Sequence, residues 1–185
     1  FGLDGLEGAQ KAFKAQKLEP VFVEKFDRSK PDFSAIAPKI TEGNIEAVMM
    51  VAAGAAVVEG VKAFRTAGAK AQIVTRSNNA AGGFIKSLGE NARGVIVTQV
   101  YPNERSLTFP LVKEAIDLAK AKGMTEVSPA MLEGFAAAKV LVEGLRRAGP
   151  KPSREKIQTA LESIQKFDLG GLDISYGPDD HTGLD

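Results

Sequence analysis

One stretch of the chain, AVMMVAAGAAVVEGVKAF at residues 47–64, constrains the fold more than any other. It begins as an unbroken apolar run, passes through the small residues Ala53, Gly54 and Ala55, and continues with apolar residues at helical spacing. A short apolar run without alternation is typical of a strand that is buried on both faces, as in a parallel sheet. The segment therefore predicts a buried strand that leads into a helix through a turn of very small residues.

The same succession of helix and strand extends through the first hundred residues. Apolar runs predict four strands, at 21–25, 45–51, 71–75 and 94–100. Helical spacing predicts helices before and between them, at about 3–18, 32–43, 54–67 and 79–88. Asp32 is expected to cap the second of these helices, although Pro38 predicts a kink or a later start. Short connections between such elements indicate an α/β fold, in which a parallel sheet is flanked by helices.

The pattern changes after Tyr101. A polar connector leads to helices at 109–122 and 129–148, with no strand between them. Ser153 is expected to cap a further short helix, and a strand is predicted at 172–176. The helix at 129–148 is apolar almost all round, so it should be buried on more than one side. We expect the rest of this chain to cover it poorly.

Composition excludes several classes of protein. Apolar residues make up 44% of the chain and charged residues 25%, which are values of a globular protein. The 24 basic and 23 acidic residues leave a formal charge of +1, and no basic stripe with interleaved aromatic residues supports nucleic-acid binding. No apolar run reaches the roughly 18 residues of a membrane span. The absence of cysteine removes disulfides, thiolate chemistry and cysteine-ligated metals.

The turn at Ala53-Gly54-Ala55 lacks the known nucleotide and nucleophile motifs. A dinucleotide fingerprint needs G-x-G-x-x-G, a Walker loop needs Gly-Lys-Ser/Thr, and a nucleophile elbow needs G-x-S-x-G. Two interpretations stay open. The small residues either let the helix pack closely, or they expose N–H groups at the helix start to a small polar ligand at the carboxyl edge of the sheet.

Two other segments carry candidate site residues. The sequence TRSNN at 75–79 follows a predicted strand, so Ser77 or Asn78 would cap the next helix, contact a ligand, or do both. Tyr101 falls where the chain leaves the predicted sheet and would be either a rigid loop start or an aromatic wall beside a cleft. His181, the only histidine, is expected in a solvated turn, because its spacing from nearby acids fits no closed metal site.

No nucleophile, base and orienting group stand together in a pattern that predicts catalysis. The sequence therefore predicts a protein that is not an enzyme, with no catalytic residues, no cofactor and no metal. For the turn at Ala53-Gly54-Ala55, the functional interpretation that stays open beside close packing is a small ligand in a cleft.

Three segments carry a resemblance to a known family: GVIVTQVYP at 94–102, SPAMLEGFAAAKVLVEGLRRAG at 128–149 and LGGLDISYGPDDHTG at 169–183. They resemble the periplasmic substrate-binding proteins of branched-chain amino acid ABC transporters, the type I leucine/isoleucine/valine-binding relatives. The resemblance extends over nearly the whole chain. It implies two α/β lobes joined by three crossovers, with a solute trapped between them. It also implies a periplasmic location and a membrane permease as partner.

The resemblance also implies a division of the chain. Residues 1–101 would form most of the second lobe, residues 102–170 would be helices that pack on the first lobe, and residues 171–185 would be the return crossover strand and loop. The sheet of the first lobe, and any signal peptide, would precede Phe1. The N-terminal lobe of the same protein is therefore an expected partner of this segment.

In this family an aromatic residue usually stands where Phe1 stands and lines the cleft. Binders of branched-chain amino acids also have an aromatic residue near Ala53 and an acidic residue near Ser77, and this chain has neither. A buried ammonium without a carboxylate partner is costly. A guanidinium at Arg76 would instead favour a carboxylate ligand if its side chain enters the cleft, although strand alternation could equally aim it outwards.

The expected ligand is therefore a small amino acid or organic acid, with an organic acid preferred. The expected ligand-binding residues are Phe1, Ala53, Gly54, Arg76, Ser77, Asn78 and Tyr101. The alternative is a ligand-sensing domain of a regulator or receptor with the same lobe architecture. A DNA-binding segment or a membrane helix outside these residues would mark that alternative.

Overall fold

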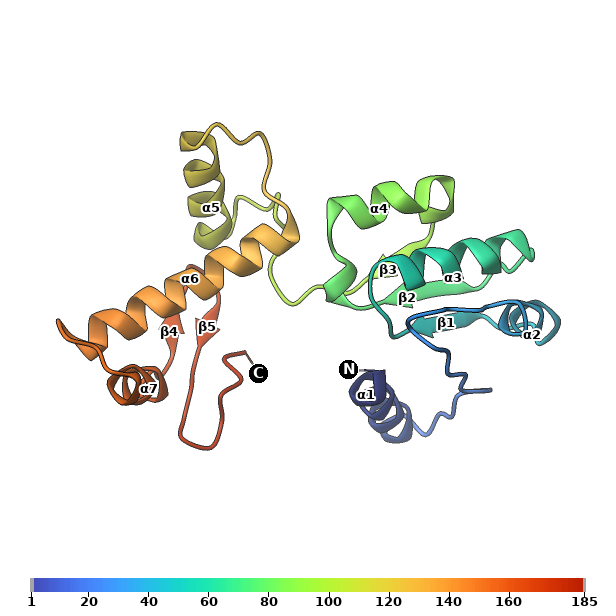
Figure 1. The fold of residues 1–185 in the computed structure, drawn as a ribbon, viewed down its shortest axis with the longest axis horizontal. Coiled ribbons are helices and arrows are strands. Elements are labelled where there is room, and N and C mark those ends of the chain that lie inside the picture. Colours follow the sequence, from blue (N-terminus) through green and yellow to red (C-terminus); the bar gives the residue numbers. More distant parts are fainter. Residues whose placement is uncertain (1, 185) are drawn as a thin grey trace. The chain divides into compact units, whose positions relative to one another are not determined.

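The computed structural model describes residues 2–184, which form two compact units on either side of the bond between Val100 and Tyr101 (Figure 1). The first unit is built on a parallel sheet of three strands, in the order β1-β2-β3. Its strands are β1 (Ala47–Met50), β2 (Gln72–Thr75) and β3 (Val95–Val97). The predicted α/β class with a parallel sheet is confirmed.

The register of this sheet brings the carboxyl ends of the strands to one level. Met50 at the end of β1 pairs with Thr75 at the end of β2, and Thr75 pairs with Val97 at the end of β3. The turns that follow these strands consequently begin at the same edge of the sheet.

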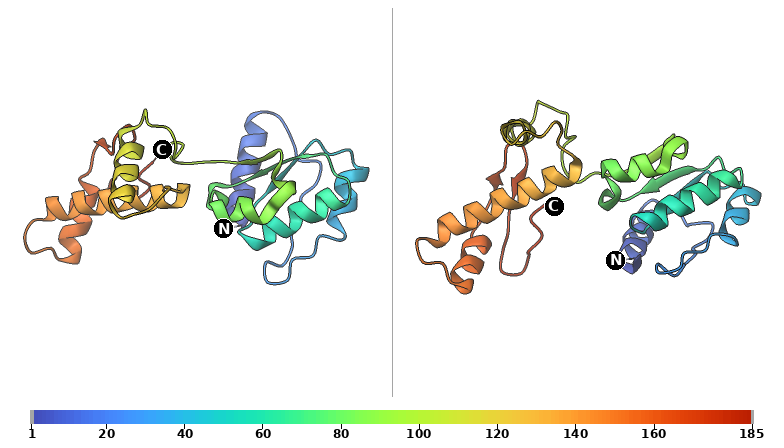
Figure 2. Two further views of the ribbon diagram at one scale, coloured as in Figure 1. Left: turned by 90° about the horizontal axis from the view of Figure 1, so that it is seen from above. Right: turned by 45° about the horizontal axis from the view of Figure 1, so that its top comes forward.

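Helices lie on both sides of the sheet in the first unit. They are α1 (Gly2–Ala15), α2 (Ile36–Glu42), α3 (Ala55–Thr66) and α4 (Gly82–Leu88), with short 3₁₀ turns η1 (Ser77–Asn79) and η2 (Gly89–Ala92). Gly60 of α3 lies against the side chains of Met50 and Phe33, so closely that a Cβ would meet both. Val51, the next residue after β1, lies against Gly5 of α1. Because neighbouring strand residues point to opposite faces, α1 and α3 lie on opposite sides of the sheet (Figure 2).

The strands are not buried on both faces, as had been predicted. Met49 and Ile96, on the face away from α3, are 45% and 49% exposed.

The core of the first unit lies between the sheet and α3. It is made of fully or nearly buried apolar side chains from α2, β1, α3, β2 and α4, with Val57, Val61, Phe64, Ile73 and Leu88 the most deeply buried. The ring of Phe33 packs edge-on against that of Phe64, with the two ring centroids 5.6 Å apart.

Three further predictions in this unit are wrong in detail. Residues 21–25 form no strand, although Phe22 packs partly against the core. The helix predicted from Asp32 begins only at Ile36, which confirms the later start that Pro38 predicted. Asp32 does not cap it, because Asp32 Oδ1 instead accepts a hydrogen bond from Ser34 N–H at 2.9 Å in the preceding turn. The helix predicted from Asn79 begins at Gly82, because Asn79 belongs to the 3₁₀ turn η1.

The second unit contains three helices and a small antiparallel ribbon. The helices are α5 (Pro110–Ala121), α6 (Pro129–Ala148) and α7 (Arg154–Glu162), and the ribbon pairs β4 (Phe167–Asp168) with β5 (Asp173–Ile174). The predicted bounds of α6 are confirmed, and Ser128 Oγ caps it by accepting a hydrogen bond from Met131 N–H at 3.3 Å. The strand predicted at 172–176 is shorter than expected. The core is formed by Leu111, Val112, Ala115, Leu132, Ala136, Leu169 and Ile174.

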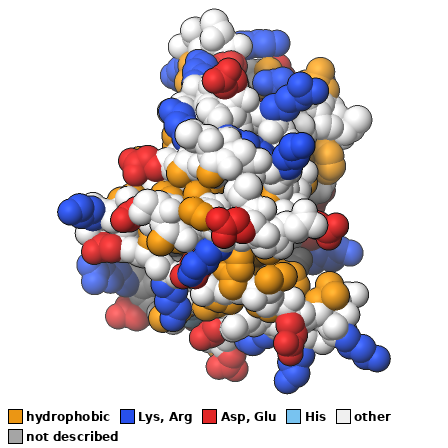
Figure 3. Space-filling model, turned by 90° about the vertical axis from the view of Figure 1, so that its right-hand side faces the viewer, with side chains coloured by type: hydrophobic (Ala, Val, Ile, Leu, Met, Phe, Trp, Pro, Cys, Tyr) orange, Lys and Arg blue, Asp and Glu red, His pale blue; other side chains and the backbone are white. Residues whose placement is uncertain are grey.

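The surface of α6 is covered unevenly, as its apolar sequence predicts. Leu141, Val142 and Leu145 are 50%, 64% and 38% exposed, whereas Met131 and Phe135 are half-buried. Among residues 2–184, no helix combines the length and the apolar character that crossing a membrane requires. On the face in Figure 3, acidic and basic side chains lie interspersed among apolar ones.

Candidate functional site

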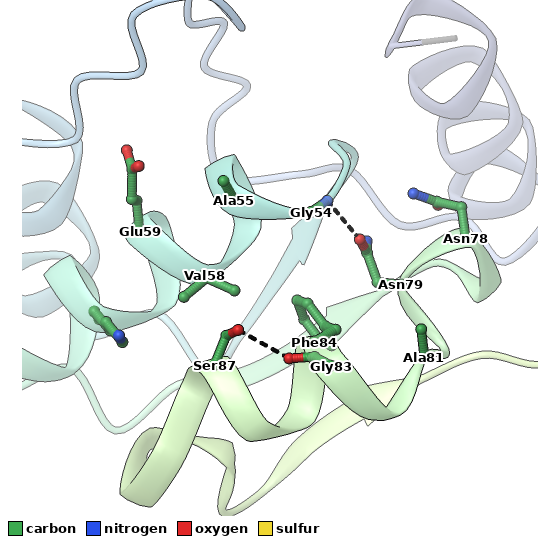
Figure 4. A pocket seen from close by; sticks show the side chains of 11 residues that line it. Gly54, Ala55, Val58, Glu59, Asn78, Asn79, Ala81, Gly83, Phe84 and Ser87 are labelled. Atoms are coloured by element: carbon green, nitrogen blue, oxygen red, sulfur yellow. Dashed lines mark hydrogen bonds between the residues drawn. The ribbon is translucent and has the colours of Figure 1, made fainter. Parts of the chain in front are cut away.

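Two turns meet at the carboxyl edge of the sheet in the first unit. One follows β1 and contains Ala52, Ala53 and Gly54, and the other follows β2 and contains residues 76–79. The Oδ1 atom of Asn79 accepts a hydrogen bond from Gly54 N–H at 2.8 Å (Figure 4). Its Nδ2 donates to the carbonyl oxygen of Ala52 at 3.1 Å. One buried side chain therefore joins the two turns.

The same side chain is tied to the ends of both strands through Thr75. Asn79 Nδ2 also donates to Thr75 Oγ1 at 2.9 Å, and Thr75 Oγ1 donates to the carbonyl oxygen of Met50 at 3.1 Å. Asn79 is 2% exposed and Thr75 is fully buried. Every donor and acceptor atom of these two side chains has a partner, which a buried polar group requires for stability.

Gly54 adopts a backbone conformation that favours glycine, with φ of 52° and ψ of −119°. A Cβ built on Gly54 would meet no atom within 4 Å, so the conformation and not the space explains the glycine. No side chain caps the first turn of α3. The exposed residues Ala53, Gly54 and Ala55 thus present small side chains and backbone at the edge.

An open groove of about 540 Å³ starts at this edge and continues between α3 and α4 (Figure 4). Its lining includes Gly54, Asn78 and Asn79 at the edge of the sheet, and Lys62 and Ser87 farther along α3 and α4. Val58 and Phe84, which are 9% and 8% exposed, lie along it. The volume is in the range of small-molecule sites, and the surface combines apolar side chains with a few polar groups.

Arg76 lies at the carboxyl edge, because it is the first residue after β2. A Cβ built on Gly5 would lie 3.0 Å from Arg76 Nη1, so the guanidinium lies against the first turns of α1. Asp4, in the first turn of that helix, interacts electrostatically with Arg76. The side chain is only half-buried. A cation therefore stands at this edge with an acidic neighbour.

The structure places most of the predicted site residues at this edge. Asn78 is exposed, and its Nδ2 donates to the carbonyl oxygen of Ala52 at 3.2 Å. Ser77 is half-buried and begins η1. Ala53, Gly54 and Arg76 flank these two residues, as described above. Phe1 lies outside the described residues.

Tyr101 belongs to the second unit, where it packs against the core at the start of the connector. Burial raises the pKa of its hydroxyl above the ordinary value, and the nearby charges of Glu133 and Tyr176 raise it further. Tyr101 therefore stays protonated at neutral pH and can donate a hydrogen bond.

His181 is exposed, as predicted, but lies in an irregular loop and not in a turn, and its Nε2 is 3.2 Å from Glu162 Oε1. The two side chains are 64% and 20% exposed. Within residues 2–184, no group of three or more histidine and acidic side chains is arranged to hold a metal ion.

Sequence reasoning missed Asn79. The segment Arg76-Ser77-Asn78-Asn79 offers three polar side chains in a row, and the sequence pointed to Ser77 and Asn78. No spacing rule distinguishes Asn79 from Asn78, because the contact of Asn79 with Thr75, four residues earlier, exists only once the chain folds into the turn η1.

Comparison with known proteins explains this architecture. The model of a family described as periplasmic binding proteins matches residues 1–184. The chain belongs to this family. No curated protein matched the chain.

Several solved structures of this kind are similar to the chain. A substrate-binding periplasmic protein from Ralstonia solanacearum is 29% identical, with a TM-score of 0.80 over 97% of this chain and 53% of that one. A protein from Rhodopirellula baltica SH 1, described as a possible leucine/isoleucine/valine-binding protein, is 31% identical, with a TM-score of 0.68 over 74% of this chain and 37% of that one. The chain spans about half the length of the first structure and about a third of the second.

A substrate-binding protein of an ABC transporter from Aeropyrum pernix is 17% identical and has a TM-score of 0.74, over 94% of this chain and 48% of that one. At that identity the similarity shows the fold alone. Together these findings establish a periplasmic binding protein fold and a solute-binding role for the family to which the chain belongs.

Proposed function

We propose that the intact protein is the periplasmic solute-binding component of an ABC transporter, and that it captures a small amino acid or organic acid between two lobes. The observation that carries this proposal is the pair of exposed turns after β1 and β2, which Asn79 joins at one edge of the sheet. Open α/β sheets bind their ligands at the carboxyl ends of their strands. Membership of the periplasmic binding protein family supports the same role.

In this proposal Ala53, Gly54, Ser77 and Asn78 contact the solute from the second lobe, and Phe1 and Tyr101 complete the set. Residues 1–101 are most of that lobe, residues 102–170 pack on the first lobe, and residues 171–185 return between the lobes. The exposed side chains of Leu141, Val142 and Leu145 on α6 support this division, because a first lobe would cover them. A membrane permease would receive the solute.

The preferred solute is a carboxylate that lacks an ammonium group. Arg76 supplies a cation at the carboxyl edge, and a guanidinium pairs well with a carboxylate. No acidic residue stands at or beside Ser77 to hold an ammonium. Asp4 is the nearby acid that would modulate this preference, since it interacts with Arg76.

The protein is proposed to bind its solute without transforming it. The chain has no cysteine, and His181, its only histidine, pairs with Glu162 in the second unit, whereas the turns described above belong to the first. The polar side chains joining the two turns, Asn79 and Thr75, are engaged in structural hydrogen bonds.

A thermal-shift screen of the intact protein tests the proposal. Three probes suffice: leucine, 4-methylpentanoate, which is leucine without its amino group, and benzoate. Binding raises stability by RT ln(1 + [L]/Kd), so a bound probe raises Tm as its concentration increases. We expect an acid without an ammonium to raise Tm more than leucine does. Stronger stabilisation by leucine would overturn the organic-acid preference and leave the transport role standing, whereas no stabilisation by any of the three probes would overturn the proposed function.

A further inference from the structure

We infer that Asn79 is a positioning residue of the solute site, which sets the turn at Ala52–Gly54 in the geometry that receives the ligand. The inference rests on the proposed function. Asn79 itself is 2% exposed, so it acts through the backbone that it holds and not by touching the solute.

The hydrogen bonds of Asn79 fix the turn at two points. Its Oδ1 holds the N–H of Gly54 at 2.8 Å, and its Nδ2 holds the carbonyl oxygen of Ala52 at 3.1 Å. The residue between them, Ala53, is exposed and was singled out as a candidate ligand contact. A side chain that is hydrogen-bonded to the turn on both sides of Ala53 determines where that residue points.

The turn needs such support because Gly54 is held at positive φ, with φ of 52°. A glycine has more conformations available than other residues, so an unrestrained turn would sample several of them. No side chain caps the first turn of α3 to restrain it from the other direction. Asn79 supplies the restraint from the neighbouring strand connection.

The amide of an asparagine side chain meets all these requirements at this position. The second Nδ2 hydrogen of Asn79 is donated to Thr75 Oγ1 at 2.9 Å, and Thr75 in turn donates to Met50 at the end of β1. The side chain thus uses one acceptor and two donors, a combination that aspartate and serine lack. Through this network the turn is hydrogen-bonded to the ends of two paired strands. Less conformational entropy of the turn is then lost when a ligand binds.

The experiment compares Asn79→Ala, in the intact protein, with a core variant chosen to lower Tm by a similar amount. Val61→Ala is suitable, because Val61 is fully buried on the same helix, α3, and lies two turns beyond Gly54. Thr75→Val is a milder second variant, since it removes the hydroxyl and leaves the other two bonds of Asn79 in place. Affinity is measured by calorimetry, well below each Tm, with whichever of leucine, 4-methylpentanoate or benzoate most stabilises the wild-type protein. Exchange of the Gly54 amide hydrogen is followed without any probe.

We expect Asn79→Ala to weaken binding by on the order of tenfold or more and to speed exchange of the Gly54 amide. Thr75→Val should weaken binding to a smaller extent, and Val61→Ala should leave both readouts near wild type. Equal affinity for Asn79→Ala and Val61→Ala, or unchanged affinity in Thr75→Val if Asn79→Ala fails to fold, would overturn the inference and leave the proposed function intact. A wild-type protein that binds no probe would overturn both.

Discussion

The backbone N–H of Gly54 donates to Asn79 Oδ1 at 2.8 Å, across two chain segments that are 25 residues apart. This bond joins the turn after β2 to the turn after β1 at Gly54, which has positive φ. Both turns lie at the carboxyl edge, because the register pairs Met50 with Thr75 at the ends of their strands. The arrangement leads to predictions about the glycine, the cation and the acid at this edge.

Gly54→Ala should weaken binding of the solute, and Gly68→Ala at the other end of α3 is the matched control. Gly54 and Gly68, at opposite ends of α3, have positive φ of 52° and 83°, and a Cβ on either would meet nothing within 4 Å. Alanine at either position should lower the free energy of unfolding by roughly 1–3 kcal/mol through backbone strain alone. Calorimetric titration with the best-binding probe should detect weaker binding in Gly54→Ala only. Equal affinity in the two variants would separate Gly54 from the site.

Arg76→Ala should weaken the binding of a carboxylate by roughly tenfold to a hundredfold, the worth of a charged hydrogen bond. Arg93→Ala is the control, because Arg93 is exposed and precedes β3, at the opposite edge of the sheet. It removes the same charge from the same unit. Affinities for 4-methylpentanoate and benzoate in the two variants decide the matter. Losses of equal size would mean that net charge and not Arg76 governs binding.

Asp4→Asn should strengthen the binding of an acid without an ammonium, because it removes a negative charge that interacts with Arg76. The gain should be modest, about twofold to fivefold, since Asp4 is exposed and screened by solvent. Parallel titrations with leucine and 4-methylpentanoate show whether Asp4 weakens carboxylate binding through Arg76 or itself holds an ammonium. A loss of leucine affinity with no gain for 4-methylpentanoate would show that Asp4 holds an ammonium, which contradicts the organic-acid preference.

Gly170→Ala should destabilise the second unit more than a glycine replacement that introduces backbone strain only. Gly170 has φ of +113°, and a Cβ there would lie 2.5 Å from the backbone nitrogen of Leu111, whose N–H donates to Gly170 O at 3.1 Å. This clash would be with the backbone at the start of α5, so no side chain could move aside to relieve it. Gly123, at φ of +74° with no atom within 4 Å of its Cβ position, is the control. Urea unfolding should give a clearly lower midpoint for Gly170→Ala than for Gly123→Ala.

Glu143 should make the stability of the second unit depend on pH in acid. Hydrogen bonds from Arg146 and Arg147 lower the pKa of its carboxyl group from 4.5 to about 2, and the charges of both arginines contribute further. A depressed pKa in the folded state means that the stabilisation is present above pH 4.5 and is lost as pH falls towards 2. Urea midpoints measured from pH 2 to 7 should therefore fall less steeply for Glu143→Gln than for the wild-type protein. Parallel curves for the two proteins would remove Glu143 as a source of the dependence.

The sequence determined the elements whose signals are local. The bounds of α6 followed from Ser128, which caps it, and from the apolar residues that run to Ala148. The three strands of the sheet could be predicted because short apolar runs between helical segments are typical of a parallel sheet, although Met49 and Ile96 leave one face half-exposed in this chain. These features depend on neighbours in the sequence, so one sequence suffices to predict them.

The misses concern features that depend on distant partners. Residues 21–25 have the composition of a strand, but β-propensity reflects packing beside a neighbouring strand and is weak without one. Asn78 and Asn79 are adjacent and chemically identical, so only the folded turn reveals that Asn79 points inward. The direction of Arg76 likewise depended on α1, whose position at the edge was not visible in the sequence.

Hydrogen exchange of the intact protein, with and without a saturating amount of the best-binding probe, tests the central claim most directly. The claim is that a small solute binds at the turns after β1 and β2. Slower exchange of backbone amides at residues 52–57 and 76–80 in the presence of the probe is the predicted result. Slower exchange confined to other segments, or no change with leucine, 4-methylpentanoate or benzoate, would contradict it.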